Sequence, residues 1–191
     1  MKNKSNLIKV SDAIARVLAF YDLNTVFSVS GGASLHLLES ISNLPQLNLL
    51  NNHHEQSSAF AADAFARILR RPGVAISTSG PGATNMLTGI AGCYFDSIPC
   101  LFITGQVSTN RQSEGTGVRQ IGFQETNIVD MVKSITKYAV KISDKEQVVP
   151  EIIKCINLSF EGRPGPVLFD IPDDIQREYI YFNTYSTRTH R

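Results

Sequence analysis

The sequence predicts an α/β fold, a three-layer sandwich in which helices cover both faces of a roughly six-stranded, mainly parallel sheet. Two observations support this prediction. Short apolar segments alternate with segments of helical periodicity, which is typical of a parallel sheet built from strand–helix–strand units. The strand-like segments are also almost uniformly apolar, as expected for strands that are buried on both faces. The length of 191 residues suits one ordinary domain.

Six helices are predicted from apolar residues at helical spacing. Ser11 is expected to cap the first helix. Pro150 is tolerated in the first turn of the last helix, which can therefore begin near Val149. The predicted helices cover residues 11–21, 34–41, 55–69, the segment from the glycine-rich turn at 79–85 to about 94, 124–132 and 145–160.

Six strands are predicted at residues 25–30, 47–50, 74–78, 100–104, 136–142 and 167–171. The polar, aperiodic segment 108–122 is predicted to be a long loop, and such loops in compact domains are often functional. After Pro172 the pattern fades, and residues 179–191 are polar and aromatic without a period. We therefore predict one domain over residues 1–176 and a tail or the start of an interdomain linker over 177–191.

Composition excludes several classes of function. The 18 basic and 17 acidic residues give a net charge of +1 without a basic patch, so nucleic acid is not an expected partner. No apolar stretch approaches the ~20 residues that span a membrane, and the N-terminus lacks the apolar region of a signal peptide. Cys93, Cys100 and Cys155 lack metal-site spacing, so we expect buried free thiols in a reducing, cytoplasmic compartment.

Four polar or glycine-rich segments follow predicted strands, where a parallel sheet presents its ligand site. They are residues 30–34, 53–56, 79–85 and 105–106. The segment SGPGATN at 79–85 leads into a helix, so its backbone N–H groups could bind a phosphate. It is neither a GxGxxG nor a Walker A motif, and a tight strand-to-helix turn explains its glycines equally well.

Glu55 opens an alanine-rich helix, where an acidic residue complements the helix dipole by ~0.3–1 kcal/mol even without a catalytic role. His53 and His54 are adjacent but lack a third partner, so we predict no metal site in this chain. Asp96 and Asp170 lie near the ends of a helix and a strand. Solvated or capping roles are expected for both.

Five sequence blocks, taken together and in order, resemble the N-terminal pyrimidine-binding domain of thiamine-diphosphate-dependent enzymes of the acetolactate synthase type. The resemblance extends from about Ile8 to Gln176, and TSGPGATN with a downstream DSIP and TGQV is its most specific part. The blocks are VFSVSGGA (26–33), HHEQSSAFAADAFAR (53–67), TSGPGATNMLTGIAGCYFDSIPCLFITGQV (78–107), FQETNIVDMVKSITKYA (123–139) and GRPGPVLFDIPDDIQ (162–176).

The resemblance implies that Glu55 is the catalytic residue. A carboxylate bonded to the pyrimidine ring nitrogen favours the imino form of the exocyclic amine, which can then accept the proton of the thiazolium C2. Pro81, Gly82 and Asn85 match positions that bind the cofactor together with Glu55. The residues that match the substrate side of the family's site are Gly31, Gly32, Ala33, Phe123 and Gln124.

The resemblance also implies thiamine diphosphate and Mg²⁺ as cofactors and a small 2-keto acid as substrate. In the family a second domain with a GDG…N segment holds the metal and the diphosphate, and this sequence lacks that segment. We therefore expect a fragment or one subunit of an enzyme, inactive in isolation. It would work as a homodimer or homotetramer, or with a separate diphosphate-binding subunit. FAD use in the full enzyme is not readable from these residues.

Two departures from the family pattern leave the substrate open. Ser30 stands where the family often has proline, and His53 stands where it often has arginine. Carboligation and decarboxylation remain alternatives, and so does a non-catalytic binding or scaffold domain that keeps the fold. A dinucleotide-binding module ranks last, because SGGAS at 30–34 replaces the expected GxGxxG. The alanine-rich stretch 59–66 fits either a helix interface between chains or close packing on its own sheet.

Overall fold

The computed structural model describes residues 6–182 and has a six-stranded, fully parallel sheet with the strand order β3-β2-β4-β5-β7-β6. Every residue of the three central strands β4, β5 and β7 is buried. This confirms the predicted fold class and explains the uniformly apolar strand segments. The strands are β2 (Thr25–Ser28), β3 (Asn48–Asn51), β4 (Gly73–Ser77), β5 (Cys100–Gln106), β6 (Tyr138–Lys141) and β7 (Pro166–Pro172).

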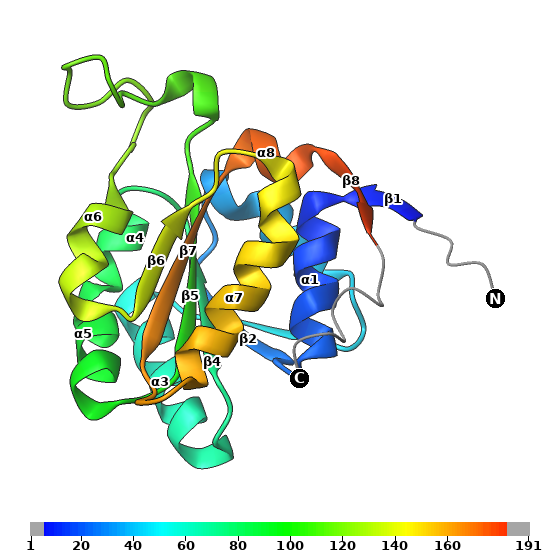
Figure 1. Cartoon of the computed structure of the whole chain (residues 1–191), viewed down its shortest axis with the longest axis vertical. Coiled ribbons are helices and arrows are strands. Elements are labelled where there is room, and N and C mark those ends of the chain that lie inside the picture. Colours follow the sequence, from blue (N-terminus) through cyan, green and yellow to red (C-terminus); the bar gives the residue numbers. More distant parts are fainter. Residues whose placement is uncertain (1–5, 183–191) are drawn as a thin grey trace.

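Helices cover both faces of the sheet (Figure 1). The first layer contains α1 (Val10–Phe20), α2 (Leu35–Ser42), α7 (Val148–Phe160) and α8 (Asp173–Arg177). The second contains α3 (Glu55–Leu69), α4 (Pro81–Asn85), α5 (Leu87–Asp96) and α6 (Ile128–Val132). Short 3₁₀ turns are η1 (Gly32–Ser34), η2 (Thr109–Arg111), η3 (Lys133–Ile135) and η4 (Lys145–Gln147).

Each helical layer encloses its own hydrophobic core. Successive side chains of a strand point to opposite faces of its sheet. Along β5, Leu101 and Ile103 therefore join the core under α1 and α7, whereas Phe102 joins the core under α3 and α5. The two cores together bury the central strands on both faces.

The alanine-rich helix α3 lies unusually close to the sheet. A Cβ atom added to Gly73 of β4 would lie 1.9 Å from the carbonyl oxygen of Ala62, and one added to Gly89 of α5 would lie 2.4 Å from the Cβ of Ala59. Ala59, Ala62 and Ala66 are all buried. These small residues thus serve close packing within the chain.

A two-stranded antiparallel ribbon lies beside α1, formed by β1 (Asn6–Lys9) and β8 (Tyr179–Phe182). The sequence analysis missed both strands. The expectation that residues 179–191 lack regular structure is wrong for 179–182, where exposed tyrosines alternate with buried Ile180 and Phe182. This alternation of exposed and buried residues is explained by the pairing of β8 with β1 at the other end of the chain. Residues 183–191 of the predicted tail lie outside the described residues.

Two helix starts differ from the predictions. Ser11 does not cap α1, which begins at Val10; Ser11 is buried and accepts a hydrogen bond from the hydroxyl of Ser40 at 2.8 Å. The helix predicted from Gln124 begins only at Ile128, because Gln124 has a left-handed φ of 61°. The last long helix begins at Val148, close to the predicted Val149.

The three cysteines are buried free thiols, as predicted, and the sulfur atoms of Cys93 and Cys100 lie 3.6 Å apart. Within residues 6–182, no helix has both the length and the apolar character that crossing a membrane requires.

Candidate functional site

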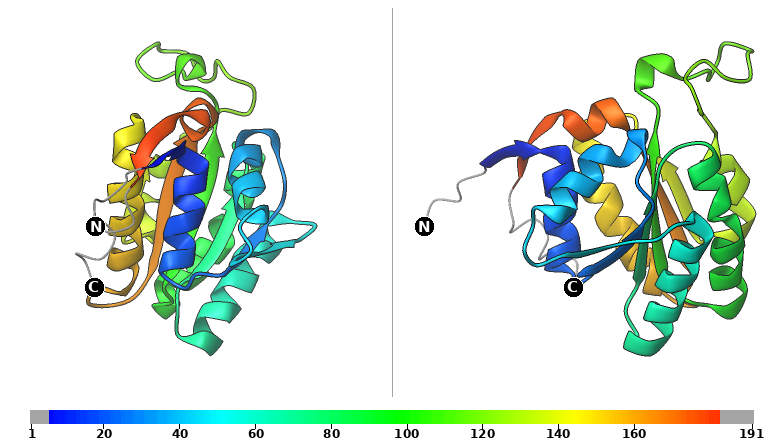
Figure 2. Two further views of the ribbon diagram at one scale, coloured as in Figure 1. Left: turned by 90° about the vertical axis from the view of Figure 1, so that its right-hand side faces the viewer. Right: turned by 180° about the vertical axis from the view of Figure 1, so that it is seen from behind.

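The segments singled out in the sequence meet at the carboxyl edge of the sheet. The chain runs outward from β2 to the edge strand β3, and then returns to β4 on the other side of β2. Such a reversal of strand order opens a crevice, the usual ligand site of an open parallel sheet. The loops at this crevice are residues 29–33 after β2 and 78–82 after β4, and the loop 107–127 projects above them (Figure 2).

Glu55 is the first residue of α3, and its carboxylate is held in place by neighbours. His54 precedes the helix in an extended conformation, and its Nδ1 accepts a hydrogen bond from Gln56 N at 3.1 Å. The partly buried Glu55 accepts a hydrogen bond at Oε2 from Asn85 Nδ2 at 2.9 Å. Its Oε1 lies next to Gly82, where an added Cβ atom would be 3.3 Å away. The structure thus brings three of the four predicted cofactor-binding residues together.

The glycine-rich turn is tight because other segments approach it closely. Gly80 has φ 59° and ψ −122°, which a residue with a side chain rarely adopts. A Cβ atom there would lie 2.7 Å from the carbonyl oxygen of Gln124. Pro81 follows at the first position of α4 and is exposed. This geometry is the tight strand-to-helix turn named above as the alternative to a phosphate site.

Thr78 links the two halves of the crevice, although the sequence analysis did not select it. Its Oγ1 accepts a hydrogen bond from Ala33 N at 3.1 Å. Cβ atoms added to Gly31 and Gly82 would lie 2.4 Å and 2.7 Å from its side-chain carbons. Glycine is therefore required at both positions by close approach, and Thr78 sets the spacing between the loop after β2 and the turn after β4.

The peptide carbonyl of Ala33 is fixed by residues from distant parts of the chain. Buried Gln176 donates from Nε2 to this oxygen at 2.8 Å, and to the carbonyl of Ile171 at 2.9 Å. A Cβ atom on Gly105 would lie 2.1 Å from the same oxygen. Gln176 is the second residue that sequence reasoning missed here.

A pocket of about 310 Å³ opens beside Thr78 and collects most of the predicted substrate-side residues. Gly32, Ala33, Phe123 and Gln124 line it, and Phe123 is 78% exposed. Gly31 contacts Thr78 but is not part of the lining. The remaining lining residues are Thr78, Ser79, Val107, Ser108, Arg111 and Asp173.

Asp170 is not solvated, so the prediction made for it is wrong. It is 1% exposed at the carboxyl end of β7. Thr104 Oγ1 donates to its Oδ1 at 2.6 Å, and Gln106 Nε2 donates to its Oδ2 at 3.1 Å. Burial raises the pKa of the Asp170 carboxyl to about 6, although these two hydrogen bonds favour the charged form. Asp96 is exposed and pairs with Arg67 at 2.6 Å.

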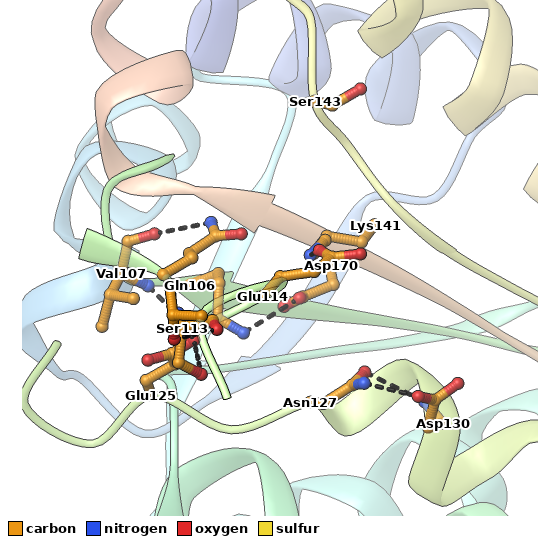
Figure 3. Close-up of polar contacts among 12 residues, drawn as sticks. Gln106, Val107, Ser113, Glu114, Glu125, Asn127, Asp130, Lys141, Ser143 and Asp170 are labelled. Atoms are coloured by element: carbon orange, nitrogen blue, oxygen red, sulfur yellow. Dashed lines mark hydrogen bonds and ion pairs between the residues drawn. The ribbon is translucent and has the colours of Figure 1, made fainter. Parts of the chain in front are cut away.

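A second hollow, of about 320 Å³, is lined by Gln106, Lys141 and residues of the loop 107–127 and α6, and Figure 3 shows the polar contacts of this region. Lys141 of β6 pairs there with Glu114 of the loop. Glu125 accepts hydrogen bonds from Ile121 N at 2.9 Å and from the Ser113 hydroxyl at 2.8 Å. Burial alone would raise the pKa of Glu125, but hydrogen bonds from the loop backbone and Ser113 hold it below its ordinary value. Glu125 is therefore the centre around which the loop folds.

Among residues 6–182, no group of three histidine, cysteine, aspartate or glutamate side chains is arranged to hold a metal ion. His54 caps α3, and His53 is exposed. Ser30, the other departure from the family pattern, is also exposed.

Comparison with known proteins agrees with this geometry. The family model described as "Thiamine pyrophosphate enzyme, N-terminal TPP binding domain" matches residues 8–131. The chain is 40% identical over 170 residues to a chloroplastic acetolactate synthase of Arabidopsis thaliana, covering 89% of this chain and 24% of that protein. It is 42% identical over 173 residues to acetolactate synthase 2 of Zea mays, covering 89% and 26%. The chain thus spans about a quarter of the length of these curated relatives.

Proposed function

The chain belongs to the family of thiamine pyrophosphate enzyme N-terminal TPP binding domains, and we propose that it is the pyrimidine-binding, cofactor-activating part of an acetolactate synthase-like enzyme. The observation that carries this proposal is the arrangement of Glu55. Its carboxylate is anchored on one oxygen by Asn85, and its other oxygen faces the close turn at Gly82.

The residues of this site fit the pyrimidine half of the cofactor. Gly82 has no side chain beside Glu55 Oε1: an added Cβ atom would lie 3.3 Å from that oxygen and 2.7 Å from Thr78, so the backbone of the turn can stay close to the carboxylate and to a flat ring bound there. When bound, thiamine diphosphate supplies an acidic thiazolium carbon as the nucleophile for carbonyl substrates. Glu55 would share a proton with a ring nitrogen through Oε1, while Asn85 keeps the carboxylate from rotating.

Substrate and metal would be held by different groups. We propose that a small 2-keto acid occupies the pocket lined by Gly32, Ala33, Phe123 and Gln124, where Arg111 supplies a positive charge for its carboxylate. Carboligation and decarboxylation of such a substrate share their first step. Mg²⁺ and the diphosphate would be bound by residues outside this part of the enzyme.

Helix α3 supports an association with another chain or domain. Phe60, Ala64 and Ile68 recur every four residues and form one exposed stripe on the helix that Glu55 begins. Phe60 is 46% and Ile68 is 78% exposed. Apolar side chains gathered on one helix face favour burial against a partner. We propose that a second subunit or a diphosphate-binding domain covers this stripe and completes the site.

The substitution Glu55→Gln tests the proposal. In the holoenzyme that contains this chain, we expect the exchange of the cofactor C2 proton for deuterium, followed by NMR, to slow by about 10²–10⁴-fold. Glutamine fills the same space, so the circular dichroism spectrum and melting temperature should stay unchanged.

The substitution Glu39→Gln is the matched control, because Glu39 is an exposed carboxylate of α2 that pairs with Lys9. It should leave the deuterium exchange rate unaltered. A Glu55→Gln holoenzyme with full exchange and full turnover would contradict the assignment and favour a scaffold domain instead. Calorimetric titration of the 191-residue chain with thiamine diphosphate and Mg²⁺ should show only weak binding.

A further inference from the structure

We infer that Gln106 is a positioning residue: its side chain joins both ends of the loop 107–127 to the sheet and thereby holds Phe123 and Gln124 at the pocket beside Thr78. The inference rests on the function proposed for that pocket. It concerns a residue of β5 that does not line the pocket itself.

Within the loop 107–127, the amide of Gln106 bonds to the first residue, Val107, and to the residue before the last, Thr126. Its Oε1 accepts a hydrogen bond from Val107 N at 3.0 Å, and its Nε2 donates to the carbonyl oxygen of Thr126 at 2.7 Å. An amide is suited to this task because it carries an acceptor and a donor on one planar group. One side chain therefore closes a loop of about twenty residues.

The orientation of this amide is fixed from the sheet side. Gln106 is 3% exposed, and its Nε2 also donates to Asp170 Oδ2 at 3.1 Å. Asp170 is held in turn by the Thr104 hydroxyl at 2.6 Å. Figure 3 shows Gln106 between Asp170 on the sheet and Val107 at the start of the loop. A buried amide with these partners has one favourable orientation, since a flip would place its oxygen against the carboxylate.

Thr126 lies only two residues from Gln124. The hydrogen bond from Gln106 to the Thr126 carbonyl therefore limits the positions that Phe123 and Gln124 can take. Gln124 has a left-handed backbone, and its carbonyl packs on the turn at Gly80. At the other end of the loop, Val107 lines the same pocket. Glu125 organises the interior of the loop through its bonds to Ser113 and Ile121, whereas Gln106 connects the loop to β5.

The first test needs no catalytic activity. In the 191-residue chain, Gln106→Ala removes two hydrogen bonds to the loop and should raise amide hydrogen exchange across 107–126 by roughly 10- to 100-fold. Gln106→Met keeps the side-chain volume and tests the same bonds if the alanine variant does not fold. Gln147→Ala is the matched control, because this amide also accepts a backbone hydrogen bond, from Ser143 N, outside the loop.

A spin label at Phe123→Cys reports directly on the substrate-side position, because Phe123 is exposed and the three native thiols are buried. The lines of its electron paramagnetic resonance spectrum should narrow with Gln106→Ala, because the label becomes more mobile, and stay unchanged with Gln147→Ala. In the holoenzyme, Gln106→Met should raise KM for the keto acid by about tenfold, while exchange at the cofactor C2 continues at the parent rate.

The outcomes separate this inference from the proposed function. If hydrogen exchange and label mobility are unchanged in folded Gln106 variants, the positioning role is wrong, whatever the enzyme does. If the loop loosens but KM stays the same in an active holoenzyme, Gln106 is structural only and the inference is also overturned. If the loop loosens and the parent holoenzyme shows no keto acid turnover, the position of Phe123 still depends on Gln106, but the function proposed for the pocket fails.

Discussion

Replacing Asp170 with asparagine should change stability by an amount that depends strongly on pH. Burial raises the pKa of the native carboxyl from 3.8 to about 6. The folded protein thus binds this proton more tightly than the unfolded chain does. The resulting stability is fully present below pH ~4 and is lost as the pH rises through ~6. At ~1.4 kcal/mol for each tenfold change in proton affinity, the loss amounts to ~3 kcal/mol.

The asparagine side chain of this variant carries no such charge, and it can still accept a hydrogen bond from Gln106 and donate one to the Thr104 hydroxyl. The free energy of unfolding of Asp170→Asn minus that of the parent should therefore rise by ~3 kcal/mol between pH ~4 and pH ~7. Urea unfolding followed by circular dichroism at several pH values measures this difference. The slope of the free energy of unfolding against urea concentration should be the same for both proteins, because the same surface is exposed on unfolding.

Thr104→Val gives an independent check on the cause. It removes the 2.6 Å hydrogen bond that favours the charged carboxylate of Asp170. The decline in the free energy of unfolding with rising pH should therefore become larger and extend to higher pH. A difference between Asp170→Asn and the parent that does not vary with pH would refute the reasoning, because it would mean that the carboxylate is not desolvated in the folded protein.

Two further predictions concern the turn and the helix surface. Gly80→Ala should destabilise the fold by ~1–3 kcal/mol in urea unfolding, because its φ is 59° and the new Cβ would lie 2.7 Å from the Gln124 carbonyl. Gly92→Ala, inside α5 with no atom within 4 Å, should instead stabilise by up to ~1 kcal/mol, and equal effects would contradict this account. Ile68→Asp should weaken self-association or subunit binding in sedimentation at unchanged melting temperature, whereas Leu35→Asp, also exposed but on α2, should not. If both variants associate as strongly as the parent protein does, the α3 stripe is not an interface.

Local patterns were sufficient to predict the parallel sheet, whereas the role expected for Glu55 came from the family resemblance. The uninterrupted apolar segment 100–104 predicts a strand with both faces covered, and β5 is buried throughout. Glu55 begins a helix after the edge strand β3, which is mostly exposed. The ribbon of β1 and β8 was missed because its four-residue strands are stabilised by each other across the length of the chain. Ser11 was misassigned for a related reason, since its hydroxyl is used by Ser40 of another helix.

The two aspartates show most directly what local sequence cannot decide. Asp96 and Asp170 both lie at the end of an element, yet one is exposed and the other is buried beside Thr104 and Gln106. The difference arises because Asp170 lies beside the buried strand β5, whereas Asp96 ends helix α5 at the surface.

By itself, the sequence determined the fold class, the edge of the sheet where the candidate site lies and the family resemblance, because these follow from periodicity and from contiguous motifs. Only the tertiary structure decided that Asn85 orients Glu55, that Thr78 spaces the two glycine loops and that Gln106 joins both ends of the long loop. These contacts join residues that are mostly tens of positions apart. A hydrogen bond depends on distance and angle in space, so such pairs leave no pattern along the chain.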